Sequence, residues 1–113
     1  MLTRGETAVE TAEVAKGCGE WIFGRSLDSP FVSFMATKVR LATTMNGKNI
    51  IDGYNSPLES SWGIRDGNLV FYDEEGVVST LFDTVSRHLD GRMKLSGIYQ
   101  PDPTLQSDLI CIR

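Results

Sequence analysis

The chain has 113 residues, of which 41% are hydrophobic and 23% are charged. This length suits a single domain with one core, and the composition differs from that of a disordered chain. The net charge is −4, and the eleven lysines and arginines are scattered rather than gathered into a stripe. These features exclude a strongly basic surface, so we expect no nucleic-acid partner.

No uninterrupted apolar stretch approaches the roughly 20 residues that a membrane helix requires, so we expect a protein with no membrane partner. Residues 1–19 lack the basic start and the apolar centre of a secretory signal. The chain as given is therefore expected to be either cytoplasmic or a fragment without its leader, and we favour the cytoplasm.

The N-terminal segment, residues 1–18, predicts a short helix or an arm. Residues 7–10 have the form of a capping box, and Ala12 and Val14 continue a thin apolar face before Gly17. A loosely docked arm is an equal alternative, because a helix this short is marginal without packing.

Four dipeptides typical of hairpin turns punctuate the rest of the chain, between runs rich in β-branched and aromatic residues. They are Asn46-Gly47, Asp66-Gly67, Glu75-Gly76 and Asp90-Gly91. Because such pairs accept the positive φ of two-residue hairpin turns, strands that are neighbours in the chain should be neighbours in the sheet. We expect strands at residues 21–26, 32–45, 48–54, 60–65, 68–72, 77–87, 93–99 and 108–113.

Two of these strands leave alternatives open. Residues 32–45 divide into two pieces if a bulge falls at Ala36 and Thr37. Residues 77–87 also fit helical spacing, with Ser79 as an N-cap. Their β-branched residues and flanking hairpin turns favour a strand.

A meander of this kind leaves two exposed edges unless the sheet closes, and closure into an up-and-down barrel removes both. We therefore predict an all-β fold, an antiparallel up-and-down meander of about eight strands that closes into a small barrel over residues 19–113. A barrel of this size either fills its interior with side chains or holds one small ligand.

The first expected strand opens with Gly19-Glu20-Trp21, which has the Gly-x-Trp form found at the start of the first barrel strand in lipocalins and avidin-like proteins. The chain thus resembles the calycins, and its size is closer to the avidin-like members. In that superfamily the Trp caps one barrel end and a basic side chain of the last strand packs across it, a role that the resemblance implies for Arg113. The resemblance also implies ligand binding in general, and it makes a homodimer conceivable, since avidin-like barrels often pair through their outer walls.

Period-two alternation predicts which side chains face the interior. The expected core contains Trp21, Phe23, Val39, Leu41, Trp62, Ile64, Leu69, Phe71, Leu81 and Leu95. A polar group on an inner wall must be paired, hydrated or functional, so polar residues of the same parity are candidates for ligand binding. These are Thr43, Asp52, Ser60, Ser79 and Tyr99.

The sharpest candidate site is the hairpin that joins the third and fourth of these strands. It brings the carboxylates of Asp52 and Glu59 and the rings of Tyr54 and Trp62 toward one barrel mouth, an arrangement that suits a sugar or another small polar ring. In the stronger alternative, the two rings are core residues and the two carboxylates belong to turns.

No metal site and no cofactor is expected. The single histidine, His88, and two distant cysteines have no metal-ligand spacing, and the chain has neither a nucleophile elbow nor a phosphate-binding loop. Closure of the barrel would bring Cys18 near Cys111. The two cysteines could form a disulfide that locks the closure, or they could stay reduced. The expected cytoplasmic setting favours reduced thiols.

Three functions remain open at this point. We rank first a barrel that binds a small molecule or a saccharide without catalysis. The second is an enzyme of the cyclase or isomerase type with Asp52 or Glu59 as acid or base, which gains support if Asp52 is buried and faces a closed pocket. The third is an interaction or accessory module, which an exposed apolar patch would favour. The residues of that patch are Phe31, Phe34, Met35 and Tyr72.

Overall fold

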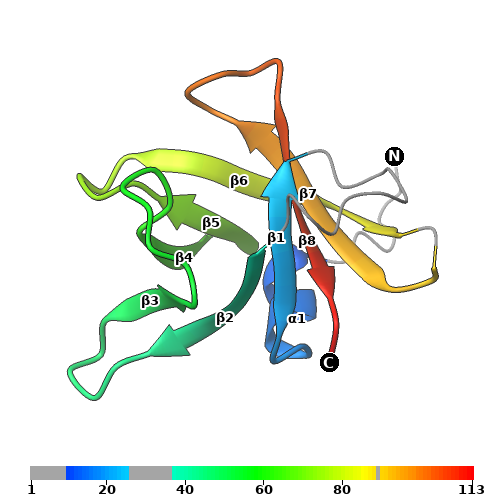
Figure 1. Ribbon diagram of the computed structural model, residues 1–113, viewed down its shortest axis with the longest axis horizontal. Helices are drawn as coiled ribbons and strands as arrows, with labels where there is room; N and C mark the ends of the chain where they lie inside the picture. Colours follow the sequence, from blue (N-terminus) through cyan, green and yellow to red (C-terminus); the bar gives the residue numbers. More distant parts are fainter. Residues whose placement is uncertain (1–9, 26–36, 89) are drawn as a thin grey trace.

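A computed structural model of the protein describes residues 10–25, 37–88 and 90–113. These described residues form one short helix and eight strands (Figure 1). They are α1 (Thr11–Lys16), β1 (Trp21–Arg25), β2 (Thr37–Thr43), β3 (Asn49–Asp52), β4 (Ser61–Arg65), β5 (Asn68–Tyr72), β6 (Val78–Arg87), β7 (Met93–Tyr99) and β8 (Gln106–Cys111). The strands form one antiparallel sheet in the order β3-β2-β1-β8-β7-β6-β5-β4. The predicted all-β meander is confirmed, including the strand in place of the rival helix at β6.

The sheet closes through the pairing of β1 with β8, which runs from Trp21 opposite Cys111 to Arg25 opposite Ser107. The barrel stays open between β3 and β4, the two ends of the strand order, where the described residues form no ladder. The chain turns away from β3 at Gly53, whose φ is 90° and whose added Cβ would lie 2.8 Å from the carbonyl oxygen of Lys38. The result is a nearly closed barrel with one unpaired boundary between β3 and β4, named the seam below.

The four glycine turns connect strands as expected, but with two geometries. Asp66 and Gly67 both have positive φ, 51° and 83°, as in a two-residue type I′ hairpin. At Gly47 the glycine N–H bonds to the carbonyl of Thr44, and the Thr44 N–H bonds to the carbonyl of Lys48. This is the three-residue loop in which a type I turn is followed by a positive-φ glycine. The same pair of bonds recurs around Gly76 and Gly91.

The barrel interior is filled by side chains over most of its length. The buried apolar cluster consists of Trp21, Phe23, Val39, Ile51, Leu69, Phe71, Phe82, Leu95 and Leu109. The ring of Phe71 lies 5.3 Å from that of Phe23 and 4.9 Å from that of Phe82, in the tilted and edge-on arrangements that aromatic pairs prefer.

Three expectations about core and inward-facing residues are wrong. Ile64 lies on the inner face of the sheet, but it is 47% exposed and is not part of the core. Leu81 is only partly buried, because its neighbour Phe82 occupies the core. A β-bulge between Phe82 and Thr84 then shifts the alternation along β6, which period-two counting does not anticipate. In β3 the buried residue is Ile51, so Asp52 faces outward and is exposed.

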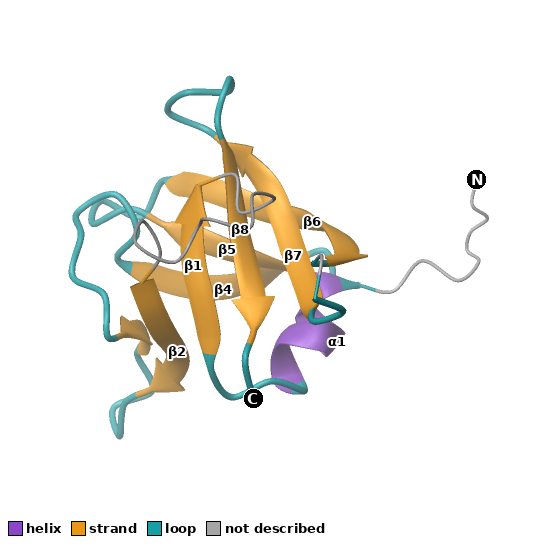
Figure 2. Ribbon diagram, turned by 45° about the vertical axis from the view of Figure 1, so that its right-hand side comes forward, coloured by secondary structure: helices purple, strands orange, loops and turns teal. Residues whose placement is uncertain are grey.

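Helix α1 lies at the end of the barrel where the chain's C-terminus is found (Figure 2). Thr11 is fully buried, and its hydroxyl donates to the carbonyl of Phe82 at 2.6 Å and accepts from the N–H of Leu69 at 2.8 Å. The N–H of Ala12 bonds to the carbonyl of Gly67 at 3.0 Å. These bonds explain why a six-residue helix forms here, since short helices depend on tertiary packing.

Several expectations concern residues outside the described ranges. They are the start of the capping box at Thr7, the bulge at Ala36, and the patch residues Phe31, Phe34 and Met35.

Gly97 of β7 marks a close approach to β6, since an added Cβ would overlap with the carbonyl oxygen of Leu81. We expect Gly97→Ala to lower the free energy of unfolding by about 2–3 kcal/mol, because the two backbones must separate. Urea denaturation followed by circular dichroism measures this. Gly17→Ala is the control, because Gly17 has a φ of −85° and its added Cβ would meet only ordinary contacts. Equal effects of the two substitutions would contradict the proposed overlap.

Candidate functional site

An apolar hollow of about 370 Å³ lies between α1, the segment after it, β2 and β4. The barrel contributes Leu41, Trp62 and Ile64. Trp62 pairs with Phe71 and Ile64 pairs with Leu69, so both share the inner face of the sheet with the core. The hollow is thus the unfilled end of the barrel interior beside the seam, and α1 forms one of its walls.

Trp62 supplies the aromatic surface of the hollow. Its Nε1 donates to the carbonyl of Ala42 at 3.0 Å, a bond that links β4 to β2 although these strands are not neighbours in the sheet. Since this bond occupies the only donor of the indole, the half-buried ring offers apolar surface to a ligand.

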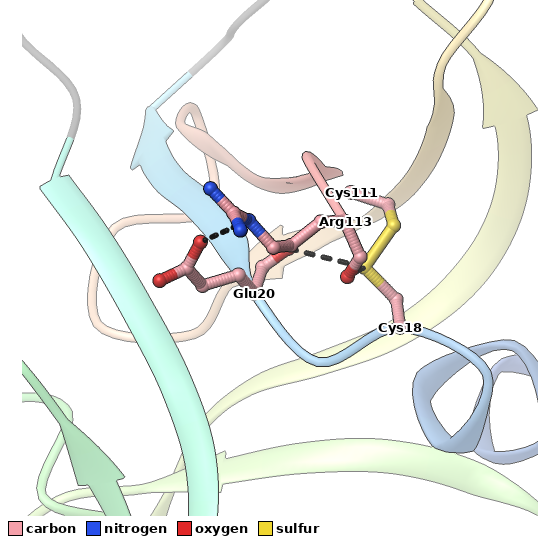
Figure 3. The surroundings of a disulfide bond; sticks show 4 residues. All are labelled: Cys18, Glu20, Cys111 and Arg113. Atoms are coloured by element: carbon pink, nitrogen blue, oxygen red, sulfur yellow. Dashed lines mark hydrogen bonds and ion pairs between the residues drawn. A yellow bond between two sulfur atoms is a disulfide. The ribbon is translucent and has the colours of Figure 1, made fainter.

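A disulfide fixes a second wall of the hollow. Cys18, one of the lining residues, is bonded to Cys111 across 93 positions of sequence, with 6.0 Å between the Cα atoms (Figure 3). The preference for reduced thiols is therefore wrong. The β1–β8 ladder places Cys111 opposite Trp21, within reach of the segment that leads from α1 into β1.

Arg113 does not take the role that the calycin resemblance implied. Its Nε lies 3.1 Å from Oε1 of Glu20, and its side chain is 80% exposed (Figure 3). Its carbonyl oxygen accepts from the N–H of Gly19 at 2.8 Å. Trp21 is fully buried. Because the Arg113 side chain is so exposed, little of its surface is left to pack over the Trp21 ring.

The expected site at the β3–β4 hairpin is divided in the structure. The hydroxyl of Tyr54 donates to Oε1 of Glu59 at 3.1 Å, and Glu59 is fully buried. Trp62 turns instead to the apolar hollow. Asp52 lies on the outer face opposite Arg40 of β2. The structure thus brings Tyr54 and Glu59 together, but it separates them from Asp52 and from the hollow.

The other four candidates lie outside the lining of the apolar hollow. Thr43 and Ser60 are exposed. Ser79 is buried, and its hydroxyl donates to the carbonyl of Phe71 at 3.2 Å. Tyr99 is also buried, with 7% of its surface exposed.

Sequence reasoning missed the contribution of α1 to the site. Ala12 and Ala15 line the hollow, and their spacing puts both on one face of the helix. That spacing was visible in the sequence, but two alanines do not reveal which surface they face.

In the described part of the chain, no group of three or more His, Cys, Asp or Glu side chains could hold a metal ion. The described residues also contain no helix with the length and apolar character needed to cross a membrane.

Fold and hollow together define a small antiparallel β-barrel with a docked helix. Compared with known proteins, the chain matches no family model, no curated protein and no solved structure. Its function is therefore inferred from its own geometry.

Replacing both cysteines by serine should lower the free energy of unfolding by about 4 kcal/mol, because the disulfide closes a long loop in the unfolded chain. Thermal denaturation with and without a dithiol reductant measures the effect. The reduced wild-type protein is the matched control and should melt close to the double variant. A double variant as stable as the oxidised protein would show that the cross-link adds nothing.

Proposed function

We propose that this protein is a non-catalytic barrel that binds one small molecule in the apolar hollow between α1, β2 and β4. The main support is the position of Trp62, which lines a hollow of about 370 Å³ beside an otherwise filled barrel interior. The indole N–H of Trp62 is already bonded to the carbonyl of Ala42. Ligand pockets range from about 300 to 1,000 Å³, so this volume favours a small ligand.

The lining indicates the chemistry of the ligand. Leu41, Trp62 and Ile64 favour a flat apolar or aromatic group held by dispersion and ring contact. Lys16 is the charged residue of the lining, and its exposed ammonium lies 3.4 Å from the Glu13 carboxylate. A ligand with an anionic group at its outer end could share this cation, so a small aromatic carboxylate suits the hollow better than a sugar does.

A calycin-like relationship is part of this proposal. Gly19, Glu20 and the fully buried Trp21 at the start of β1 support it, whereas the pairing of Arg113 with Glu20 argues against a full correspondence. The homodimer and the absence of a nucleic-acid partner stay predictions. The cytoplasmic location also stays a prediction, and the disulfide weighs against it, because such bonds persist in non-reducing compartments.

The enzyme alternative receives less support. Asp52 is exposed, and the buried Glu59 accepts a hydrogen bond from Tyr54 away from the hollow. The interaction-module alternative depends on an exposed apolar patch that includes Tyr72. The ring of Tyr72 instead lies beside Gly63 on the neighbouring strand, which does not favour that alternative.

Titration with 2-naphthoate, followed by ¹H–¹⁵N NMR, tests the proposal. We expect saturable shifts at the Trp62 indole and the Ala15 amide, with a Kd between about 10 μM and 1 mM for so small a ligand. Ala15→Phe should abolish these shifts because the added ring fills the hollow. Glu13→Phe is the matched control on the exposed side of α1: it should keep the saturable shifts and lower the Kd slightly, because it removes the carboxylate that lies beside Lys16. Absence of saturable shifts in the wild-type protein would contradict the proposal.

Lys16→Gln tests how much of the affinity for 2-naphthoate comes from the Lys16 charge and how much from apolar contact. We expect the substitution to raise the Kd of 2-naphthoate about two- to fivefold, the range of a weak exposed ion pair. The Kd of neutral 2-naphthol should stay the same. Isothermal titration calorimetry compares the two ligands, and an equal change for both would remove Lys16 from ligand recognition.

A further inference from the structure

A second hollow of about 370 Å³ lies on the outer wall of the barrel over β6, β7 and β8, and most of its lining residues are polar or charged. It shares no lining residue with the apolar hollow, so it raises a separate question. Its polar lining residues are Asp83, Thr84, Ser86, Lys94, Ser96 and Gln106.

The strand register arranges these side chains in two rows. Thr84 of β6 lies opposite Ser96 of β7, and Ser96 lies opposite Asp108 of β8. In the next row Ser86 lies opposite Lys94. Lys94 and Ser96 flank Leu95, a core residue, so both project from the outer face of the sheet.

Ser96 is the unusual member of this group. Ser96 is 6% exposed, and among the residues that the structure describes its Oγ has no hydrogen-bond partner. A buried hydroxyl without a partner is unfavourable and rare in native structures, and it calls for an explanation. Lys94 is also 6% exposed and adds a charged group to the lining of the same hollow. A ligand that both donates and accepts hydrogen bonds would satisfy the Ser96 hydroxyl.

The charges of the lining favour a neutral ligand. The lining holds one ammonium, that of Lys94, and one carboxylate, that of Asp83, and Asp108 opposite Ser96 adds a second carboxylate. Such a balance does not attract an anion. The amide nitrogen of Gln106 donates to Oδ1 of Asp108 at 2.8 Å, which leaves the amide oxygen of Gln106 to accept from a ligand.

We propose that this outer hollow binds a monosaccharide unit through Ser96, Lys94 and Gln106. Sugar hydroxyls would donate to the amide oxygen of Gln106 and accept from the Lys94 ammonium. With the Ser96 hydroxyl they can act as donor or as acceptor. Ile98, which is 45% exposed and also lines the hollow, presents an apolar surface to the C–H face of the sugar ring.

The test is a titration of the whole chain with D-glucose, D-galactose, D-mannose and N-acetyl-D-glucosamine, followed by ¹H–¹⁵N NMR. Sugar concentrations reach about 100 mM, because single sugars bind shallow sites weakly. Sulfate serves as the anion probe. We expect at least one sugar to produce saturable shifts at the amides of Ser96, Gly97 and Gln106, and sulfate to produce none there.

Ser96→Ala should weaken that sugar's affinity by roughly fivefold, the worth of one hydrogen bond. Its melting temperature should stay the same or rise, because the substitution removes a hydroxyl without a partner. Ser79→Ala is the matched control, since it removes a buried hydroxyl that is bonded to Phe71. It should lower the melting temperature and leave sugar affinity unchanged.

Three results would overturn the proposal. The first is the absence of saturable shifts at these amides with all four sugars. The second is saturation by sulfate at lower concentration than by any sugar. The third is an unchanged sugar affinity in Ser96→Ala.

Discussion

The pairing of β1 with β8 is the constraint on which the rest of this structure depends. It joins the start of the barrel to its end, so the sheet order runs through that junction and its two free ends become β3 and β4. The same ladder aligns Cys111 with Trp21 and brings Cys18 within bonding distance. The position of the seam and the formation of the disulfide are therefore two consequences of one closure.

The two hollows arise from two different interruptions of the sheet. At the seam the missing ladder exposes the inner face of β4, so the space beside Trp62 and Ile64 has the apolar character of the interior. On the outer wall, the hollow adjoins the bulge between Phe82 and Thr84, and outward-facing side chains line it. Because the faces of a strand alternate, apolar residues line the opening to the inside, and most residues that line the depression outside are polar.

Local signals made most of the fold predictable. Glycine turns such as Asp66-Gly67 punctuate the chain, and β-branched residues in β6 outweighed its helical spacing. The bulge in β6 was not predictable from the alternation of its residues: Phe82 lies in the core before the bulge, and Val85 packs against the core after it. Parity reasoning failed for Asp52 for a simpler reason: Ile50 and Ile51 are both apolar, so alternation alone does not say which of them faces inward, and in the structure it is Ile51.

The apolar hollow could not be predicted from the sequence either, because its walls come from elements that are distant in the chain. Trp62 was recognised as a candidate, but its partners come from α1 and β2, which only the closed barrel brings near it. The open edges of β3 and β4 would ordinarily invite pairing with another chain. Here the Trp62–Ala42 bond links β4 to β2, while buried Thr11 anchors α1 against β5 and β6. These contacts border the same hollow, so a ligand that filled it would join α1, β2 and β4 and stabilise the side of the barrel that the sheet leaves open.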